Sequence, residues 1–272
     1  MPELPEIASR ARQMNAELAG KVISNVEIVQ PKCLNLPVEA FQTALCGSTI
    51  GEVTYRGKWL FVHLDNGWLL LNLGMGGEIL LLTRSSLPEK YRLLVDFQDG
   101  SCLAVNFWWF GYAHFVPEDG LPHHEMTRKL GPNALDLTAA DLKRLFNGKS
   151  GRLKSVLLDQ STIAGIGNAY IHDILFLARL HPLRPVNSLT DLEIEALANA
   201  IQQGLRPSLE KNGAFYEVDL HGWRGSFTME DILIGYKEGQ PCPRCQTSIQ
   251  KIKTGSTSSF ICPVCQPLLN VS

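Results

Sequence analysis

Hydrophobic positions follow a helical spacing at the start of the chain and a strand-like spacing after it. Between Pro5 and Leu18 apolar residues recur every three or four positions, which predicts an amphipathic helix. Short segments rich in branched and aromatic residues follow, separated by turn sequences such as Asp65-Asn66-Gly67 and Asp99-Gly100. They predict an antiparallel sandwich or barrel. The expected strands are 22–28, 50–55, 59–64, 68–73, 78–82, 92–97 and 102–107.

Beyond about residue 126 the spacing becomes helical again. Helices are predicted over 139–145, 152–157, 168–178 and 191–211. Within the third of them, His172 and Asp173 are compatible with polar positions on the helix surface. The segment 212–239 is rich in glycine and polar residues, which predicts a mobile loop. Strands followed by helices indicate a chain with two structural parts.

Composition sets bounds on the class of protein. The 272 residues are 45% hydrophobic and 19% charged, as in a globular protein with a sizeable core. The chain has no apolar run of about 18 to 20 residues and no apolar core in its N-terminal segment, so we expect a cytoplasmic protein without a membrane partner. The net charge of −2 counts against a nucleic-acid partner. However, the charged residues between Pro241 and Cys265 are Arg244, Lys251 and Lys253, all basic.

Two pairs of cysteines near the C-terminus have the spacing of a metal site. The pairs are Cys242-Pro-Arg-Cys245 and Cys262-Pro-Val-Cys265, with 16 residues between them. This predicts one structural Zn²⁺ held by four thiolates, with no open position for chemistry. The alternative is a pair of disulfides or incidental thiols. Segments 249–253 and 259–261 predict the two strands of a hairpin that the metal would hold.

The first residues, Met1-Pro2-Glu3-Leu4-Pro5-Glu6, permit two interpretations. Removal of Met1 would expose the secondary amine of Pro2, and an α-amine titrates near pH 8. Such an amine can attack a sugar carbon or an aldehyde and form an iminium. The alternative is a plain helix entry with prolines before the first turn, and the segment alone does not decide between them.

Further motifs are distributed over nearly the whole chain, and together they resemble the formamidopyrimidine-DNA glycosylase and endonuclease VIII family of bifunctional base-excision enzymes. The motifs are Pro2-Glu-Leu-Pro-Glu6, Arg56-Gly-Lys58-Trp-Leu, Leu73-Gly-Met75-Gly-Gly, Leu130-Gly-Pro132, Leu158-Asp-Gln160, Ile163-Ala-Gly-Ile-Gly-Asn168-Ala-Tyr, His181-Pro182 and Cys262-Pro-Val-Cys-Gln266. The resemblance implies an α+β fold. An N-terminal antiparallel β-sandwich flanked by helices would precede a helical domain with a helix–two-turns–helix element and a zinc-ribbon hairpin. The expected domains are 1–130, 131–239 and 240–272.

The resemblance implies a role for each residue of a catalytic group. Pro2 is the nucleophile once Met1 is gone, and Glu3 is the acid/base that assists base departure and proton transfers on the Schiff base. Lys58 would donate to a phosphate or to the sugar oxygen in the cleft; the alternative is a solvated lysine in a hairpin turn. Glu6 would support the same pocket, or would accept hydrogen bonds from N–H groups of the first helical turn.

The resemblance also implies contacts with DNA phosphates. Gly165 and Gly167 would let a turn approach a phosphate, so that backbone amides and the Asn168 side chain bind it at a helix start. Lys154 and Lys253 are assigned to the same DNA-binding surface.

Other DNA contacts concern the base pair that is opened. Met75 matches an apolar wedge that fills the gap left by a flipped nucleotide; the alternative is a core methionine. Phe110 belongs to the same group of contacts. Where the family usually has an arginine facing the orphaned base, this chain has Trp109, which cannot make an arginine's bidentate contacts. Trp108 and Trp109 could instead belong to the sandwich core.

A second departure lies at the tip of the zinc hairpin. Thr257 stands five residues before Cys262, where the family has a catalytic arginine that clamps phosphates and assists the second elimination step. A threonine hydroxyl carries no charge, so Lys253 or Lys251 substitutes or that step is weakened. We therefore expect β-elimination to be favoured over δ-elimination.

These features predict a base-excision DNA repair enzyme, a DNA glycosylase with abasic-site lyase activity. We expect a monomer that binds damaged double-stranded DNA, in the cytoplasm at the nucleoid. One alternative is a relative that binds damaged or abasic DNA with weak or lost catalysis. Another is an unrelated zinc-ribbon protein that contacts RNA or protein. The preferred lesion does not follow from the sequence.

Overall fold

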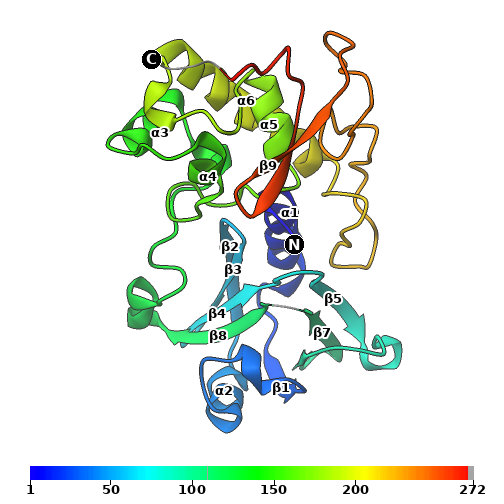
Figure 1. Cartoon of the computed structure of the whole chain (residues 1–272). Helices are drawn as coiled ribbons and strands as arrows, with labels where there is room; N and C mark the ends of the chain where they lie inside the picture. Colours follow the sequence, from blue (N-terminus) through cyan, green and yellow to red (C-terminus); the bar gives the residue numbers. More distant parts are fainter. Residues whose placement is uncertain (109, 269–272) are drawn as a thin grey trace. The chain divides into compact units, whose positions relative to one another are not determined.

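The computed structural model describes residues 1–108 and 110–268. Over these residues the chain forms two compact units, and Figure 1 labels their helices and most of their strands. Unit 1 comprises residues 1–129 and the segment 211–226, and unit 2 comprises residues 130–210 and the chain from Phe227 onward. The segment 211–226 therefore belongs to the N-terminal unit, although it follows a helix of unit 2 in the sequence.

Unit 1 begins with α1 (Leu4–Leu18), and the predicted amphipathic helix is confirmed. Pro5 lies in the first turn, where its missing N–H has no intrahelical partner to lose. Glu3 precedes the helix in an extended conformation and forms a capping box with Glu6. The apolar face of the helix is buried through Ile7, Ala11, Met14 and Leu18.

The strands of unit 1 pair into antiparallel sheets, as the sequence predicted. One sheet has the order β1-β6-β7-β5 and contains β1 (Ile23–Ile28), β6 (Leu93–Phe97), β7 (Ser101–Asn106) and β5 (Glu78–Thr83). The other has the order β2-β3-β4-β8 and contains β2 (Ile50–Arg56), β3 (Trp59–Leu64), β4 (Gly67–Asn72) and β8 (Tyr112–Pro117). In the β3–β4 turn a Cβ on Gly67 would lie 2.4 Å from the carbonyl oxygen of Val116, so only glycine fits there.

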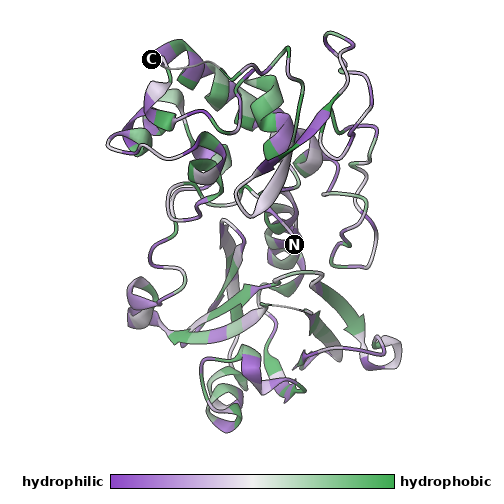
Figure 2. Cartoon of the chain, viewed as in Figure 1, coloured by the Kyte–Doolittle hydropathy of each residue, from purple (hydrophilic) through white to green (hydrophobic). Residues whose placement is uncertain are grey.

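A hydrophobic core fills unit 1 between its sheets and helices. Residues from α1, α2 (Val38–Leu45) and both sheets share one cluster of buried side chains. Every residue of β6 is buried, and Figure 2 shows β5 and β7 mostly in the green of hydrophobic residues. Burial of each large aliphatic side chain contributes about 1.5–3 kcal/mol, so this core is the main source of stability in unit 1.

The pattern of the sequence does not reveal α2 or β8. α2 is eight residues long and buries only Phe41 and Leu45, which is too short a stripe for helical spacing to be distinctive. β8 contains a histidine, ends in a proline and pairs with β4 at the edge of its sheet. β8 is held in place by its pairing with β4, and the local sequence does not reveal this pairing.

Residues 211–226 form what we call the return loop. Its ends meet where the amide of Ser226 donates to the carbonyl oxygen of Lys211 at 2.9 Å. The side chain of Gln13 on α1 donates to Asp219 at 3.0 Å and accepts from the amide of Leu220 at 3.1 Å. Within the segment 212–239, for which composition predicted a mobile loop, these hydrogen bonds connect the return loop to α1.

Unit 2 is built on the four predicted helices. They are α3 (Ala139–Phe146), α4 (Leu153–Leu158), α5 (Ile171–Leu177) and α6 (Asp191–Glu210). Short 3₁₀ segments across both units lie at Pro31–Cys33, Arg84–Ser86, Glu118–His123, Ala134–Asp136 and Val186–Ser188. The segment between α4 and α5 makes two turns, which gives the expected helix–two-turns–helix element. None of the described helices is long and apolar enough to cross a bilayer.

The C-terminal hairpin consists of β9 (Gln250–Thr254) and β10 (Thr257–Ile261). β9 begins and ends one residue later than predicted, and β10 begins two residues earlier and ends at the predicted residue. Phe260 of β10 packs in a buried cluster with Phe176 of α5 and Ile234. The hairpin is therefore anchored on the hydrophobic side of α5.

His172 and Asp173 are buried, 2% and 7% exposed, so the expected position on the helix surface is wrong. The carboxylate of Asp173 accepts hydrogen bonds from the amides of residues 233–235 at 2.7–2.9 Å. The ring of His172 contacts Phe260, and its Nδ1 accepts from the Phe260 amide at 3.4 Å. Burial, and secondarily Lys154, lowers the pKa of His172 to about 3. Both side chains thus fix segments of unit 2 to α5.

Candidate active site

The first residues of the chain are buried at the start of α1. Pro2 is buried, and Glu3 and Glu6 are 4% and 2% exposed. One carboxylate oxygen of Glu6 accepts from the Glu3 amide at 2.9 Å and the other from the Ala214 amide at 3.1 Å. A Cβ on Gly213 would lie 3.0 Å from Glu6, so glycine lets the return loop approach this closely. The contacts of Glu6 are those of the first-turn carboxylate that the sequence left as the alternative.

A second buried carboxylate reaches the N-terminus from the return loop. Oε1 of Glu217 lies 3.8 Å from the amine nitrogen of Met1, and the residue is 9% exposed. Burial raises the pKa of Glu217 to about 7; the amine and Arg10 act in the opposite direction, while Glu6 and Glu3 raise it further. Arg10 is 2% exposed, and burial lowers the pKa of its guanidinium. Several acidic groups and one guanidinium therefore surround the N-terminal amine.

Lys58 lies in the turn between β2 and β3 and is half-buried. Its carbonyl oxygen accepts a hydrogen bond from the side-chain amide of Asn72 at 3.1 Å. The carbonyl oxygen of that same side chain accepts from the amide of Gly74 at 3.0 Å. Asn72 therefore connects the turn that carries Lys58 with the loop that carries Met75.

Met75, Trp108 and Phe110 are large apolar residues of unit 1 whose side chains are exposed. These residues are 51%, 66% and 70% exposed. The amide of Trp108 donates to the carbonyl oxygen of Met75 at 3.3 Å, and a Cβ on Gly76 would lie 3.4 Å from the Trp108 ring. Met75 is therefore not a core methionine, and Trp108 is not part of the sandwich core. Trp109 lies outside the described residues.

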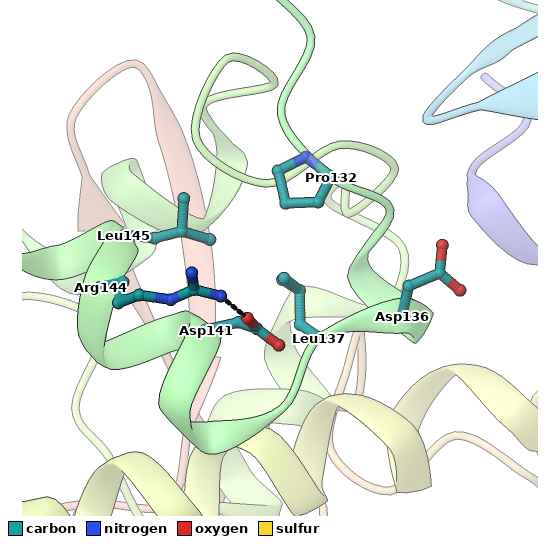
Figure 3. Close-up of a pocket in the computed structure, with 6 residues that line it drawn as sticks. All are labelled: Pro132, Asp136, Leu137, Asp141, Arg144 and Leu145. Carbon is teal, nitrogen blue, oxygen red and sulfur yellow. Dashed lines mark hydrogen bonds and ion pairs between the residues drawn. The ribbon is translucent and has the colours of Figure 1, made fainter.

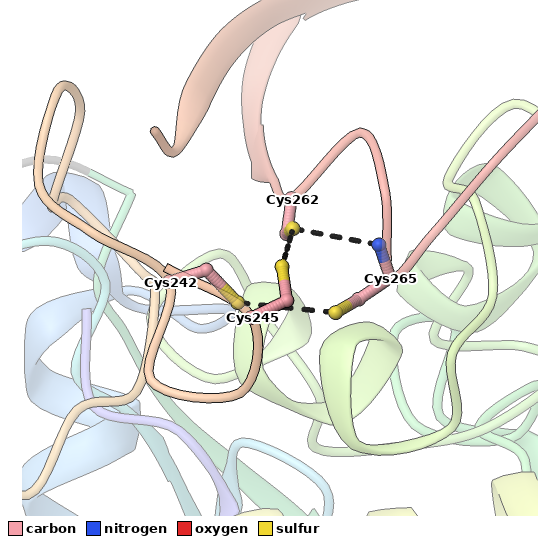
Figure 4. A group of neighbouring side chains, drawn as sticks. All are labelled: Cys242, Cys245, Cys262 and Cys265. Atoms are coloured by element: carbon pink, nitrogen blue, oxygen red, sulfur yellow. Dashed lines mark hydrogen bonds between the residues drawn. The ribbon is translucent and has the colours of Figure 1, made fainter. Parts of the chain in front are cut away.

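Four cysteine thiols of unit 2 converge on one point, as Figure 4 shows. The sulfur atoms of Cys242, Cys245, Cys262 and Cys265 all lie within 4.8 Å of one another. The Cys245–Cys262 and Cys242–Cys265 sulfur distances are 3.4 and 3.9 Å, far beyond the ~2.05 Å of a disulfide. Two ligands at about 2.3 Å from a tetrahedral Zn²⁺ lie about 3.8 Å apart. The geometry fits zinc, and the four thiolates form a closed structural site.

The tip of the hairpin is held by a buried lysine. Nζ of Lys154 on α4 donates to the hydroxyls of Thr254 and Thr257 at 3.2 and 3.0 Å and to the carbonyl oxygen of Ser258 at 2.7 Å. The residue is 3% exposed, and burial lowers its pKa to about 8. Lys253, on the same hairpin, is exposed. Of the two lysines assigned to DNA, one is thus engaged inside unit 2 and the other is accessible.

The turn before α5 is organised by Gln160. Its side-chain amide donates to the carbonyl oxygens of Leu158 and Ile166 at 3.0 and 2.9 Å and accepts from the amide of Gly165 at 2.9 Å. Gly167 is buried and Asn168 is exposed. The turn therefore presents the side chain of Asn168 at the surface of unit 2, three residues before α5 begins.

A surface hollow of about 400 Å³ lies beside α3 in unit 2. Its lining is drawn in Figure 3 and consists of Pro132, Asp136, Leu137, Asp141, Arg144 and Leu145. Arg144 pairs with Asp141, three residues earlier on α3. Hydrogen bonds, first that of Thr138 and then that of Arg144, lower the pKa of Asp141 to about 2. The described lining includes no residue to which the sequence assigned chemistry or DNA contact.

Models of known domain families match three consecutive parts of the chain. The formamidopyrimidine-DNA glycosylase N-terminal domain matches residues 1–107, and the H2TH domain of the same enzymes matches residues 130–218. A zinc finger found in FPG and IleRS matches residues 239–268. The chain is 32% identical over 271 residues to formamidopyrimidine-DNA glycosylase of Chloroflexus aurantiacus, with 98% of each chain covered. It is 33% identical over 279 residues to that of Legionella pneumophila strain Philadelphia 1, covering 99% of this chain and all of the relative.

The chain belongs to the formamidopyrimidine-DNA glycosylase family. This is a family of bifunctional DNA glycosylases and abasic-site lyases, so the expected enzyme class is confirmed. The zinc finger match and the four clustered thiols confirm the predicted zinc cofactor. The α+β fold with a helix–two-turns–helix element and a C-terminal hairpin is confirmed as well.

Solved structures of formamidopyrimidine-DNA glycosylase from Lactococcus lactis are similar over the whole chain. A complex of the wild-type enzyme with DNA containing N7-benzyl-Fapy-dG has a TM-score of 0.88 and 28% identity, covering 98% of this chain and all of that one. A complex with DNA containing an abasic site has a TM-score of 0.87 with the same identity and coverage. These relatives bind damaged or abasic DNA.

The sequence did not predict which charged groups lie near the N-terminal amine. Glu217 and Arg10 carry no motif, because their proximity to Met1 depends on the return loop folding back onto α1. Charged residues occur both in the first ten residues and in the return loop, and this is the signal that the sequence offers. The fold is needed to show that the two segments lie close together.

Proposed function

We propose that this chain removes a damaged base from double-stranded DNA and cleaves the resulting abasic site, with the amine of Pro2 as nucleophile once Met1 is removed. The observation that carries the proposal is the burial of the chain start beside carboxylates: Glu3 is 4% exposed, and Glu217 lies 3.8 Å from the terminal nitrogen. An α-amine that titrates near pH 8 is partly neutral at physiological pH. A neutral secondary amine can attack C1′ and form an iminium.

The side chains of Glu3 and Lys58 also take part in the proposed reaction. Glu3 is adjacent to the nucleophile in the sequence and buried, as a proton carrier for base departure and Schiff-base steps requires. Lys58 supplies a cation to a phosphate or to the leaving sugar oxygen. Glu6 supports the reaction indirectly, because its two oxygens bind the amides of Glu3 and Ala214.

The exposed side chains of Met75 and Phe110 are proposed to enter the DNA where the damaged nucleotide leaves the base stack. Apolar side chains are commonly used to fill such gaps, and Met75 and Phe110 are 51% and 70% exposed. Trp109, where the family has an arginine, is proposed to stack on the opposite base without reading it by hydrogen bonds.

Phosphate contacts are proposed on unit 2. Asn168, presented by the turn after Gly167, and Lys253 on the hairpin are both exposed. Lys154 is proposed to act on DNA through the hairpin tip that it holds. The zinc site keeps this hairpin rigid.

The substrate is proposed to be an oxidised or otherwise damaged base, and β-elimination is favoured over δ-elimination. The second preference is supported by Thr257, whose hydroxyl accepts a hydrogen bond from Lys154 and brings no charge to a phosphate. We further propose that the protein acts as a monomer in the cytoplasm, at the nucleoid.

A second candidate function is binding of damaged or abasic DNA with weak or lost catalysis. It is favoured by the hairpin tip, where Thr257 replaces the family's arginine and the nearest lysine, Lys154, is already engaged with the protein.

Borohydride trapping on an abasic-site duplex distinguishes the two functions. The native chain is expected to form a covalent adduct, Pro2→Gly is expected to form none, and Glu3→Gln is expected to form it much more slowly. Tight binding without any adduct would support the second function. A panel of duplexes with oxidised pyrimidines, oxidised purines, ring-opened purines and uracil then identifies the lesion.

A further inference from the structure

Glu217 is a buried carboxylate whose backbone is fixed on both sides. Its amide donates to the carbonyl oxygen of Ala214 at 2.9 Å, and its carbonyl oxygen accepts from the amide of Gly225 at 3.1 Å. A Cβ on Gly225 would lie 2.1 Å from the carbonyl oxygen of Gly213, so the two sides of the return loop touch here. The loop backbone therefore holds Glu217 in place, with Oε1 3.8 Å from the terminal nitrogen.

The charged groups that face Glu217 come from the N-terminal segment and α1. They are the amine of Met1, the carboxylates of Glu3 and Glu6, and the guanidinium of Arg10. Burial is the main reason that the pKa of Glu217 is raised to about 7. On the loop itself, Asp219 faces Arg10.

The carboxylates near the amine differ in what they already bind. Glu6 uses one oxygen for the Glu3 amide and the other for the Ala214 amide. Oε1 of Glu217 has the N-terminal nitrogen as its ion-pair partner. Glu217 therefore places a carboxylate oxygen within ion-pair distance of the amine.

We propose that Glu217 accepts the proton of the Pro2 ammonium and so produces the neutral amine that attacks the sugar. The inference rests on the proposed function, because it requires Pro2 to be the nucleophile. It gives the return loop a part in the chemistry that no motif of the sequence assigns.

The geometry of the processed chain keeps Glu217 close to the new amine. The nitrogen of Pro2 is three bonds from that of Met1, which is about 3–4 Å by standard bond lengths and angles. With Oε1 of Glu217 3.8 Å from the Met1 nitrogen, it lies at most about 8 Å from the Pro2 nitrogen. Rotation about the glutamate side-chain torsions can shorten this distance.

The proton and the electrons balance on an aldehydic abasic site. The Pro2 ammonium gives its proton to Glu217, and the nitrogen lone pair forms a bond to C1′ of the aldehyde, whose oxygen becomes a hydroxyl by taking up a proton. The nitrogen then loses its second proton, and its lone pair expels the hydroxyl group as water with a proton returned by Glu217 or solvent. The sum is one ammonium and one aldehyde giving one iminium and one water. No oxidant or reductant is needed.

The test is the rate of adduct formation with cyanoborohydride on an abasic duplex between pH 6.5 and 8.5, for the native chain and Glu217→Gln. Without the carboxylate, the amine must lose its proton to water. With a pKa near 8 its neutral fraction rises roughly 20-fold across this range. The native rate is expected to rise less steeply over this range, because the neighbouring carboxylate of Glu217 accepts the proton directly. The native-to-variant ratio is therefore expected to be largest at pH 6.5 and to fall as the pH rises to 8.5.

Two further variants keep the result interpretable. Asp219→Asn removes a charge from the same loop, at a side chain that accepts a hydrogen bond from Gln13. The ratio of the native rate of adduct formation to that of this variant is expected to be constant with pH. Glu217→Asp keeps an acid on a shorter side chain, and is expected to keep the native pH profile at a lower rate. Glu217→Asp also tests the idea if Glu217→Gln does not fold.

The outcomes separate the two proposals. A native-to-Gln ratio that does not change with pH would overturn the role of Glu217 while the Pro2 mechanism stands. A native chain that binds the duplex and forms no adduct at any pH would overturn the proposed function itself, and with it the inference.

Discussion

Nζ of Lys154 lies 3.0 Å from the hydroxyl oxygen of Thr257. The contact joins α4 to the hairpin tip. This lysine is 3% exposed and donates to three oxygen acceptors, so it stabilises the hairpin tip from inside the protein. The hydroxyl of Thr257 at the hairpin tip therefore binds a lysine of the protein itself and brings no positive charge to a DNA phosphate.

Lys154→Met should change how stability depends on pH. Burial lowers the pKa of Lys154 to about 8, whereas lysine in an unfolded chain titrates near 10.4. Between these values the unfolded chain binds the proton that the folded chain has lost, so the free energy of unfolding rises with pH. Urea unfolding at pH 8 and pH 10 should show this rise, on the order of 2 kcal/mol, in the native chain only. Equal pH dependence in both proteins would contradict the buried position.

Thr257→Arg should restore the second elimination step. A guanidinium at the hairpin tip can bind a phosphate with two parallel hydrogen bonds, which the hydroxyl of Thr257 cannot. Gel analysis of a cleaved abasic duplex is expected to show mainly β-elimination ends for the native chain and a larger fraction of 3′-phosphate ends for the variant. Predominantly 3′-phosphate ends from the native chain would refute the preference for β-elimination.

Loss of the zinc site should affect unit 2 and spare unit 1. Cys245→Ser removes one of four ligands, and a structural zinc site contributes directly to folding of its segment. Metal analysis is expected to give about one zinc per native chain and much less for the variant, with weaker DNA binding. The β-sheet signal in circular dichroism should persist, since the core of unit 1 contains no residue of the hairpin. A wholly unfolded variant would show that the two units do not fold separately.

Met75→Ala should weaken action on damaged duplexes without loss of stability. Met75 is 51% exposed, whereas its neighbour Leu73 is 2% exposed. We expect Met75→Ala to shift the free energy of unfolding by less than about 0.5 kcal/mol, and Leu73→Ala to reduce it by about 2–5 kcal/mol. Base excision by Met75→Ala should fall at least tenfold. Unchanged excision would exclude this methionine from DNA opening.

The sequence predicts those elements whose signal is local. The spacing of Ile7, Ala11, Met14 and Leu18 is enough to predict α1, and the two cysteine pairs are enough to predict the zinc site. β8 escapes such reasoning, since its place depends on pairing with β4. His172 shows the same limit, because only the packing of the hairpin on α5 makes it a buried residue.

The candidate site divides in the same way. Pro2, Glu3 and Lys58 lie in motifs and follow from resemblance, and Met75 is marked by the glycines around it. Glu217 lies more than 200 residues from the N-terminus in the sequence and 3.8 Å from it in space. No pattern of residue types encodes that contact, because it arises from hydrogen bonds between the return loop and α1.

Mass analysis of the N-terminal peptide, taken from the native chain after borohydride trapping on an abasic duplex, tests the central claim most directly. The account predicts a peptide that begins at Pro2 and carries the reduced sugar on its amine nitrogen. A peptide that still begins with Met1 in every trapped molecule, with the sugar attached elsewhere or absent, would contradict it.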